Sequence, residues 1–334
     1  MEMRRIKTIA VLGDGGWGTT LAIHLVKKNY NVRVWGPFPE YLREIQATRQ
    51  NTKFLPGIAI PPEVAFTEKL DLAIQDAQLI VLAIPSQYLA GILKQLKPFD
   101  LFHKIILSAV KGIDSRNLLR ISELVCRELG KVKLAVLSGP TIAREVALGI
   151  PTTAVIAAKD IKLARQLQDV FHSETFRIYT NSDVAGVELG GSLKNIVAIA
   201  CGVCDGLGFG TNAKAAILTR GLAEMARLGA ALGAKPQTFA GLTGLGDLVT
   251  TCFSPQSRNR SVGEKLGQGK TIDEITSQMS MVAEGISTVK AVYRLSRKHK
   301  IPMPITTEVF NIIEKKKDPQ TAVSDLMKRR VKAE

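Results

Sequence analysis

Short runs of apolar residues recur through the first half of the chain, and most are followed by a segment with helical spacing of apolar positions. Runs of about four to eight apolar, largely β-branched residues are typical of strands buried on both faces. Their alternation with helices predicts a mainly parallel sheet covered on both sides. The predicted strands are 8–12, 31–35, 79–84, 104–108, 134–137, 152–157 and 177–179, and the predicted helices include 19–28, 87–96, 118–129 and 161–171.

The pattern changes near residue 184. Beyond it strand-like runs no longer occur in the sequence, and small residues with helical periodicity dominate. We therefore expect an α/β chain of two domains: a doubly wound, mainly parallel sheet in residues 1–188 and an all-α domain in residues 189–334. A length of 334 residues suits this division, because single hydrophobic cores stop growing at about 250–300 residues.

A glycine-rich turn follows the first predicted strand and opens the first helix. Gly13, Gly15 and Gly18 fit the pattern G-x-G-x-x-G. The first glycine permits a tight turn, the second lets a pyrophosphate approach the backbone, and the third lets the helix pack closely on the strand. A glycine-rich turn without a ligand is the plainer alternative, but the flanking strand and helix favour dinucleotide binding. Residues 1–188 are therefore predicted to be a Rossmann-like dinucleotide-binding domain.

The end of the second predicted strand decides between the two nicotinamide cofactors. A carboxylate there binds the ribose diol of NAD, whereas an arginine accommodates the 2′-phosphate of NADP. Gly36, Pro37 and Phe38 supply neither. Arg33, Arg43 or the general positive charge could still attract the phosphate at low salt. We therefore expect use of both cofactors, with a modest preference for NADPH that shrinks as ionic strength rises.

Lys194 and Asn195 interrupt a predicted helix that is otherwise mostly small or apolar. On that helix Gly190, Gly191 and Ala198 lie on the same face as the lysine, which would leave space beside its ammonium. A lysine that extends its ammonium to water is the commoner case, but the emptied face and the adjacent amide favour a ligand site. Burial would lower the pKa of Lys194 and make it a usable general base near neutral pH.

Three loops carry further polar candidates. Residues 257–260, Ser-Arg-Asn-Arg, have the features of a helix start that presents two guanidinium groups. Helix N-terminal amides with a bidentate arginine hold phosphate well, although a basic exposed turn explains the same residues equally well. Residues 110–112 and 138–141 follow predicted strands, at the end of the sheet where such folds bind ligands. A plain turn is the alternative for the Gly-Pro pair in the second of these loops.

Charge narrows the classes of function. The 45 Lys and Arg residues exceed the 30 Asp and Glu residues, for a net charge of +15. Nucleic acid, a membrane surface or phosphorylated ligands would all suit that charge. The basic residues are dispersed apart from the C-terminal tail, and no helix-turn-helix or RNA-binding signature is visible. No apolar run approaches the roughly 18 residues of a membrane span. We expect a cytoplasmic protein that binds no nucleic acid and is not an integral membrane protein.

The cysteines and histidines suggest neither a disulfide framework nor a metal site. Four cysteines, at positions 126, 201, 204 and 252, are too few and too scattered for a framework of disulfides. The pair Cys201-x-x-Cys204 could be a redox or zinc half-site, but without a second pair we interpret it as two small residues packed in a helix. No cluster of histidines or carboxylates has metal-ligand spacing, so no metal is expected.

These motifs, in this order, resemble the NAD(P)-dependent glycerol-3-phosphate dehydrogenases, especially the bacterial biosynthetic form. The resemblance spans nearly the whole chain. It rests on residues 13–18, 51–56, 111–112, 137–141, 188–195, 221–225, 244–248 and 256–260.

The resemblance implies an NAD(P)H-dependent oxidoreductase. Such an enzyme interconverts dihydroxyacetone phosphate and sn-glycerol 3-phosphate by hydride transfer at C2, and it supplies glycerol 3-phosphate for glycerophospholipid synthesis. The implied partners are this phosphorylated small molecule and a second copy of the chain in a homodimer. Residues 189–334 would then be the substrate-binding domain.

The resemblance also implies roles for individual residues. Lys194 would accept the proton of the substrate hydroxyl, Lys111 would contact substrate and cofactor, and Asp247 would orient the lysine and the substrate. The further implied substrate contacts are Gly139, Thr141, Ser257, Arg258 and Asn259. The implied cofactor contacts, besides Lys111 and the fingerprint glycines, are Gly16, Trp17, Ala143, Arg258, Val282 and Glu284. Family members often carry a basic residue where this chain has Pro37, so a strict NADP preference is not implied.

Two rival functions remain open. A related two-domain dehydrogenase acting on a 3-hydroxy acid or a sugar acid would share the two domains and the lysine. Its carboxylate substrate would not require residues 257–259 at a helix start. A dinucleotide-sensing or nucleic-acid-binding regulator suits the charge, but it would have no use for Lys194 on an emptied helix face.

Overall fold

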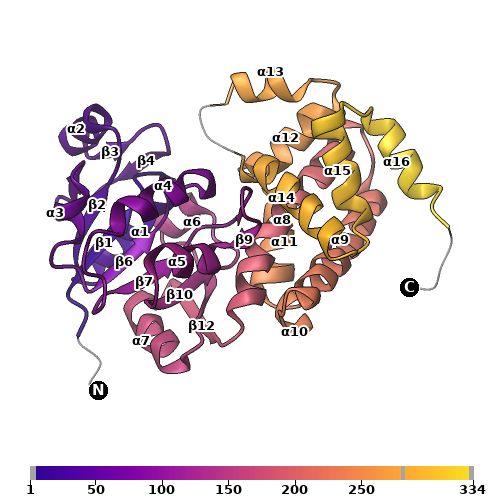
Figure 1. Ribbon diagram of the computed structural model, residues 1–334. Helices are drawn as coiled ribbons and strands as arrows, with labels where there is room; N and C mark the ends of the chain where they lie inside the picture. Colours follow the sequence, from indigo (N-terminus) through magenta and orange to yellow (C-terminus); the bar gives the residue numbers. More distant parts are fainter. Residues whose placement is uncertain (1–4, 280–282, 331–334) are drawn as a thin grey trace. The chain divides into compact units, whose positions relative to one another are not determined.

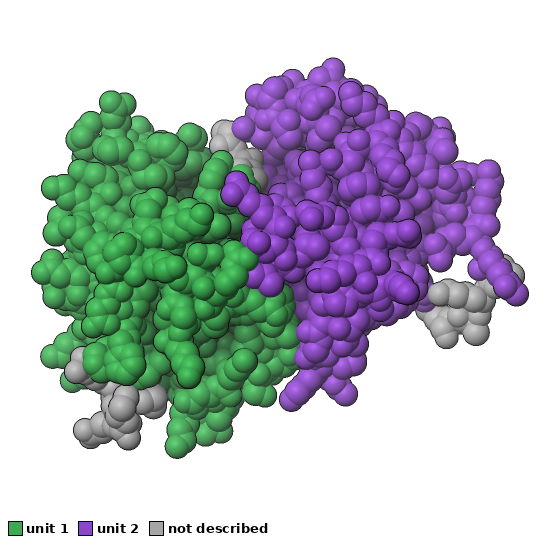
Figure 2. All heavy atoms as spheres, in the orientation of Figure 1, with its two compact units in different colours: residues 1–111, 120–187 green, residues 112–119, 188–334 purple. Residues whose placement is uncertain are grey.

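The computed structural model describes residues 5–279 and 283–330, and the chain divides into two compact units (Figures 1 and 2). Unit 1 comprises residues 1–111 and 120–187, and unit 2 comprises residues 112–119 and 188–334. The short segment 112–119 therefore packs with the C-terminal half of the chain, although it lies within the N-terminal half of the sequence.

Unit 1 is built on a sheet of eight strands. They are β1 (Thr8–Leu12), β2 (Asn31–Trp35), β5 (Ala65–Thr67), β6 (Leu79–Leu82), β7 (Ile105–Ser108), β10 (Lys133–Ser138), β11 (Thr152–Ala157) and β12 (Phe176–Asn181). Their order in space is β12-β11-β10-β7-β6-β1-β2-β5, and only the β10–β11 pair is antiparallel. The chain runs outward from β1 through β2 to β5 and then returns to β6 beside β1. This confirms the predicted doubly wound, mainly parallel sheet and places its switch point between β1 and β6.

Helices cover both faces of this sheet. Along β1, Ile9 and Val11 belong to one hydrophobic cluster and Ala10 and Leu12 to another, because alternate side chains of a strand point to opposite faces. The first cluster includes residues of α1, α2, α6 and α7, and the second includes residues of α3, α4 and α5. The helices are α1 (Gly16–Lys27), α2 (Pro39–Thr48), α3 (Leu70–Ile74), α4 (Ser86–Leu96), α5 (Ile121–Leu129), α6 (Ala143–Ala147) and α7 (Ile161–Phe171).

Some predicted boundaries are wrong by a few residues. Helix α5 begins at Ile121 rather than at residue 118, because Leu118 adopts a left-handed backbone conformation (φ 59°) between the short strands β8 (Ile113–Asp114) and β9 (Leu119–Arg120). The three-residue strand β5 and the small ladder of β3 (Gln50–Asn51) with β4 (Leu55–Ala59) were not predicted. β3 and β5 are too short to give a clear periodicity, and β4 contains Pro56 and Gly57, which are typical of a turn.

Unit 2 is helical, as predicted. Its described helices are α8 (Val184–Gly206), which starts at the end of unit 1, α9 (Thr211–Ala231), α10 (Pro236–Phe239), the π-helix η1 (Leu242–Gly246), α11 (Asp247–Phe253), α12 (Arg258–Gly267), α13 (Ile272–Ser277), α14 (Glu284–Lys298), α15 (Pro304–Lys315) and α16 (Pro319–Met327). Helix α8 is long and apolar enough to cross a membrane by length and composition, but its apolar stretch is entirely buried inside the protein. It is therefore interpreted as the core helix of unit 2.

Glycines let α8 and α12 approach until their backbones touch. A Cβ atom added to Gly202 on α8 would lie 2.0 Å from the carbonyl oxygen of Arg260, and one added to Gly263 on α12 would lie 2.0 Å from that of Ile199. Side chains would hold two helices about 8–10 Å apart. The close crossing brings the N-terminus of α12 next to the middle of α8, where the candidate lysine lies.

Candidate active site

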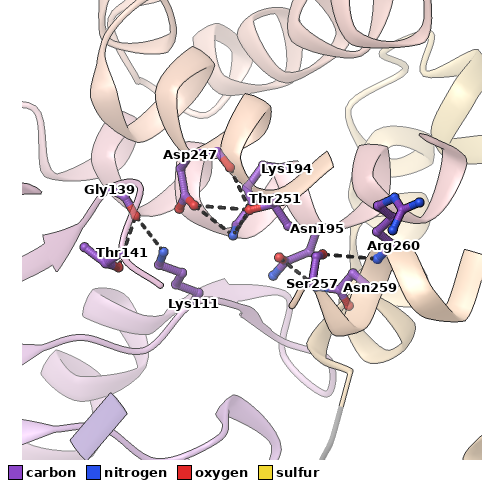
Figure 3. A network of polar contacts seen from close by, with 10 residues as sticks. All are labelled: Lys111, Gly139, Thr141, Lys194, Asn195, Asp247, Thr251, Ser257, Asn259 and Arg260. Carbon is purple, nitrogen blue, oxygen red and sulfur yellow. Dashed lines mark hydrogen bonds and ion pairs between the residues drawn. The ribbon is translucent and has the colours of Figure 1, made fainter. Parts of the chain in front are cut away.

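Lys194 is buried in unit 2 and paired with a carboxylate (Figure 3). Its Nζ donates hydrogen bonds to Oδ1 of Asp247 at 2.9 Å and to the hydroxyl of Thr251 at 2.6 Å. The Thr251 hydroxyl in turn donates to the backbone oxygen of Asp247. Lys194 is only 6 % exposed, so its ammonium does not extend to water. The predicted burial of Lys194 is thus confirmed, whereas its role stays a prediction. The contact with Thr251 was missed, because its distance in sequence gives no sign of it.

The helix face beside Lys194 is occupied by backbone at Gly190, which corrects the predicted empty space at that position. A Cβ atom on Gly190 would lie 2.5 Å from the carbonyl oxygen of Thr243, so η1 packs directly on the glycine. Asp247 begins α11 immediately after η1. The small residue on α8 therefore admits the segment that carries the carboxylate to the lysine, and π-helical turns of this kind are frequent at functional sites.

Asn195 continues the polar cluster toward α12 and α14. Its Oδ1 accepts a hydrogen bond from the side-chain amide of Asn259 at 2.9 Å. The Oδ1 of Asn259 accepts the backbone N–H of Gly285 at 3.0 Å. Both amides are buried, so this chain of bonds fixes the start of α12 and of α14 relative to the lysine helix.

The first residues of α12 border a cavity of about 190 Å³. Ser257 is the N-cap, and its hydroxyl accepts the backbone N–H of Arg260. The side chain of Arg258 is exposed at the cavity, whereas Arg260 is bound to Asp205 at 2.6 Å. The prediction that this turn presents two guanidinium groups is therefore wrong for Arg260, which holds α12 against α8. The cavity is lined by Pro255, Gln256, Ser257, Arg258, Ser261, Val262, Lys265, Ile275 and Met279.

In unit 1 the two predicted loops meet at the ends of neighbouring strands. Lys111 follows β7, and its Nζ donates a hydrogen bond to the carbonyl oxygen of Gly139, which follows β10, at 2.9 Å. The Thr141 hydroxyl donates to the same oxygen at 3.2 Å. Gly139 has a φ of 142°, and a Cβ there would approach the backbone of Ala154 to 3.0 Å. Lys111, Gly139 and Thr141 thus form one small cluster (Figure 3).

The fingerprint glycines of unit 1 have three different environments. Gly13 has a φ of 125°, and a Cβ there would lie 2.5 Å from the carbonyl oxygen of Ala83 at the switch point. A Cβ on Gly18 would lie 1.9 Å from the carbonyl oxygen of Gly13. Gly15 is the N-cap of α1, and a Cβ atom built on it would have no atom of the described residues within 4 Å. Tight turn, close packing and an open approach to helix amides are what a pyrophosphate site requires.

Neighbouring segments hold this turn in place. The buried side-chain amide of Asn51 donates to the carbonyl oxygen of Asp14 at 2.7 Å and to the hydroxyl of Thr19 at 2.8 Å. The Thr20 hydroxyl donates to the carbonyl oxygen of Ala143, so that residue lies beside α1. Trp17 packs against the core of unit 1 and meets Phe176 edge to face. The structure therefore places Ala143 beside the helix that starts at the fingerprint. The contacts of Ala143 and Trp17 with a cofactor stay a prediction.

One residue of the fingerprint carries chemistry that the sequence did not reveal. The side chain of Asp14 is 7 % exposed, and its Oδ2 has no hydrogen-bond partner within the described part of the chain. Burial raises the pKa of this carboxyl, although its own backbone N–H and the cation of Lys53 oppose the shift. The only signal in the sequence was an acidic residue between two fingerprint glycines.

The remaining candidates are Val282 and Glu284, the pair Cys201 and Cys204, and a possible metal site. Glu284 is the first residue of α14, next to the Gly285 amide that binds Asn259, and Val282 lies outside the described residues. Cys201 and Cys204 are buried in α8, and burial raises the pKa of the Cys204 thiol to about 11, which supports the interpretation as packed residues. Among the described residues no group of three or more His, Cys, Asp or Glu side chains could hold a metal ion.

Comparison with known proteins finds relatives over nearly the whole chain. Family models match residues 8–164, as the N-terminus of NAD-dependent glycerol-3-phosphate dehydrogenase, and residues 183–324, as its C-terminus. A glycerol-3-phosphate dehydrogenase (NAD(P)+) from Chlorobium phaeobacteroides (strain BS1) is 46 % identical over 98 % of both chains. One from Citrifermentans bemidjiense is 47 % identical over 98 % of both. The crystal structure of glycerol-3-phosphate dehydrogenase from Coxiella burnetii matches with a TM-score of 0.94 and 39 % identity, covering 97 % of this chain and 99 % of that one.

Proposed function

The chain belongs to the NAD-dependent glycerol-3-phosphate dehydrogenase family, and we propose from its site how it interconverts dihydroxyacetone phosphate and sn-glycerol 3-phosphate. The observation that carries the proposal is the buried ammonium of Lys194 between Asp247 and Thr251. A nicotinamide cofactor supplies or accepts the hydride at C2 of the substrate. The protein's own task is then to bind both molecules and to move one proton.

Lys194 is the group that moves the proton. In the reducing direction its ammonium donates a hydrogen bond to the C2 carbonyl oxygen, polarises the carbonyl, and gives up its proton as the hydroxyl forms. In the oxidising direction the neutral amine takes the hydroxyl proton back. Asp247 compensates the charge of the ammonium in this buried place, and the Thr251 hydroxyl fixes its direction.

Unit 1 has the features of the cofactor site. The open approach at Gly15 exposes the first amides of α1, which would hold the pyrophosphate. Gly16, Trp17 and Ala143 surround this helix start, and Lys111 lies on the adjacent strand ends with Gly139 and Thr141. Arg258, Val282 and Glu284 complete the proposed cofactor contacts from the second half of the chain.

The start of α12 is the proposed phosphate site. Ser257 caps the helix, and the exposed guanidinium of Arg258 can bind a phosphate with two parallel hydrogen bonds. Asn259 contributes by holding Asn195 and the start of α14 in place. A 3-hydroxy acid or sugar acid, the substrate of the rival dehydrogenase, has a carboxylate in place of this phosphate.

The remaining proposals concern organisation. Residues 1–188 serve as the dinucleotide-binding domain and residues 189–334 as the substrate domain, with the segment 112–119 packed in unit 2. The implied homodimer and the cytoplasmic location suit an enzyme that supplies glycerol 3-phosphate for glycerophospholipid synthesis.

Oxidation of NADH or NADPH with three substrates tests the activity. Dihydroxyacetone phosphate should be reduced with a kcat/KM at least about a hundredfold above that of dihydroxyacetone, because binding of the phosphate by Arg258 is lost in the latter. A 3-oxo acid, the oxidised form of the 3-hydroxy acid that the rival enzyme would use, serves as the third substrate. Equal rates with dihydroxyacetone would remove the phosphate site, and a faster rate with the keto acid would establish the rival function.

A further inference from the structure

The end of β2 lacks the acidic or basic side chain that usually binds the adenosine ribose or its 2′-phosphate. In doubly wound sheets a carboxylate at this point binds the ribose diol, and a basic residue binds the 2′-phosphate. Gly36 and Pro37 follow Trp35 and carry neither group. Arg33, which the sequence left as a possible cation, donates to the carbonyl oxygen of Leu72 and lies 3.6 Å from Asp76. Its guanidinium is therefore engaged at the end of α3.

The carboxyl of Asp14 lies in the volume that a side chain at position 36 would occupy. A Cβ atom built on Gly36 would lie 2.5 Å from Oδ2 of Asp14 and 2.6 Å from its Cγ. The carboxyl thus projects from the fingerprint turn to the end of β2. A side chain at position 36 would therefore displace the carboxyl of Asp14.

The contacts of Asp14 hold its backbone in place but do not pair its carboxyl oxygen Oδ2. Its backbone oxygen accepts hydrogen bonds from Asn51 and Thr19, which fix the turn, whereas Oδ2 has no partner among the described residues. A buried acceptor without a donor costs stability. Burial also raises the pKa of the carboxyl, so a donor arriving with a ligand would stabilise its charged form.

We propose that Asp14 takes the place of the missing carboxylate at the end of β2 and selects NAD over NADP. Its carboxylate accepts a hydrogen bond from the ribose diol and repels a phosphate on the 2′-oxygen, which carries about two negative charges. Because Asp14 is buried, salt screens this repulsion less than it would screen a repulsion between two exposed charges. This reverses the modest NADPH preference that residues 36–38 alone predict.

The proposal rests on the cofactor site assigned to unit 1, and nucleotide fragments without the nicotinamide test the two separately. Calorimetry on the full-length protein measures the dissociation constants of ADP-ribose and 2′-phospho-ADP-ribose at low and high salt. ADP-ribose should bind at least about tenfold more tightly at both salt concentrations, the order expected for a bond to a charged acceptor. Failure of both fragments to bind would overturn the site in unit 1. Equal or tighter binding of the phosphorylated fragment would overturn the role of Asp14 alone.

Variants assign the preference to the residue. Asp14→Asn keeps the shape and removes the charge, and it should lower the ratio of the two dissociation constants about tenfold, mainly by tighter binding of the phosphorylated fragment. Asp14→Ser, which is smaller, should lower it similarly. Glu40→Gln, an exposed carboxylate in the first turn of α2, is the control and should leave the ratio unchanged. An unchanged ratio in both folded Asp14 variants, or loss of the thermal transition in both, would show that Asp14 is structural.

A second substitution tests whether Asp14 and the end of β2 address the same part of the ligand. Pro37→Arg supplies the basic residue that a 2′-phosphate needs. It should improve binding of the phosphorylated fragment several-fold more in the Asp14→Asn background than in the parent, because Asp14 would otherwise neutralise the new guanidinium. Strictly multiplicative effects would contradict the shared location.

Discussion

The lysine cluster of unit 2 and the nucleotide turn of unit 1 are built on opposite principles. Lys194, Asp247 and Thr251 are buried and bind one another through side chains, so the geometry of the proposed proton donor exists before any ligand arrives. The turn at Gly15 offers backbone amides and open space, and Asp14 beside it keeps an unpaired oxygen among the described contacts. The proposed catalytic group is thus held rigidly by side chains, whereas the proposed binding surface keeps polar groups that a ligand would pair.

The largest expected effect on stability comes from opening the lysine cluster. Asp247→Ala leaves the Lys194 ammonium buried without its counter-charge, which should lower the free energy of unfolding by about 3–5 kcal/mol. Asp76→Ala removes the partner of Arg33 in a pair that is 35 % and 65 % exposed, and it should cost at most about 1 kcal/mol. Urea unfolding of both variants measures the contrast, and equal losses would mean that the cluster is not pre-packed.

Two glycines of the nucleotide turn should respond differently to the same methyl group. Gly18→Ala places a Cβ 1.9 Å from the carbonyl oxygen of Gly13 and should lower stability by about 1–3 kcal/mol. Gly15→Ala meets no described atom within 4 Å, so it should leave the melting temperature unchanged and weaken binding of ADP-ribose. Thermal unfolding and calorimetry separate the two. A stable Gly18→Ala protein would show that the helix does not need this close approach.

Acid should weaken unit 1 through the helix that starts at this turn. Burial lowers the pKa of His24 in α1 to about 4 from 6.5, partly opposed by its hydrogen bond to the carbonyl oxygen of Phe171. The unfolded chain therefore binds a proton first, and stability is lost as the pH falls from about 6.5 toward 4. Between pH 7 and pH 5 the loss should be about 2 kcal/mol.

His24→Gln provides the control for this pH dependence. The variant keeps a donor toward Phe171 and cannot titrate. Its free energy of unfolding is measured in urea at pH 7 and at pH 5. The difference between the two pH values should be smaller in the variant than in the parent, by the loss of about 2 kcal/mol assigned to His24. Identical changes in parent and variant would place the acid sensitivity in other groups.

The smallest expected effect distinguishes Arg258 from Arg260, which are separated by one residue in the sequence. Arg258→Lys loses the two-pronged donor and should raise KM for dihydroxyacetone phosphate about tenfold. Arg260→Lys weakens the bond to Asp205 and should lower the unfolding midpoint while KM changes by less than about twofold. A larger rise of KM in Arg260→Lys would mean that the phosphate site has been assigned to the wrong arginine.

The sequence predicted the features that depend on local pattern. The fingerprint, the strands at 8–12, 31–35 and 152–157, and the helical second half follow from periodicity and from glycine spacing, and the structure confirms them. The burial of Lys194 was also predictable, because the residues on its helix face are small and the adjacent Asn195 is polar.

The features that the sequence did not reveal depend on contacts between distant segments. The face at Gly190 was expected to be empty, but it receives the backbone of η1. Arg260 was expected to face a ligand, but Asp205 lies within reach across the α8–α12 crossing. No pattern in the sequence marked Asp14, because its carboxyl lies in the space beside Gly36, a residue distant in sequence. Each depends on which backbone passes close to which side chain, and residue spacing along one segment does not contain that information.

The rate of hydride transfer in a single turnover tests the role of Lys194 most directly. Enzyme loaded with reduced cofactor is mixed with saturating dihydroxyacetone phosphate, for the parent, Lys194→Ala, Lys194→Gln and the control Lys290→Ala, whose lysine is half exposed and pairs with Glu314. Proton transfer by Lys194 predicts that both Lys194 variants bind the cofactor normally and react about 10² to 10⁴ times more slowly, while Lys290→Ala reacts like the parent. A near-parent rate in a folded Lys194 variant would contradict it.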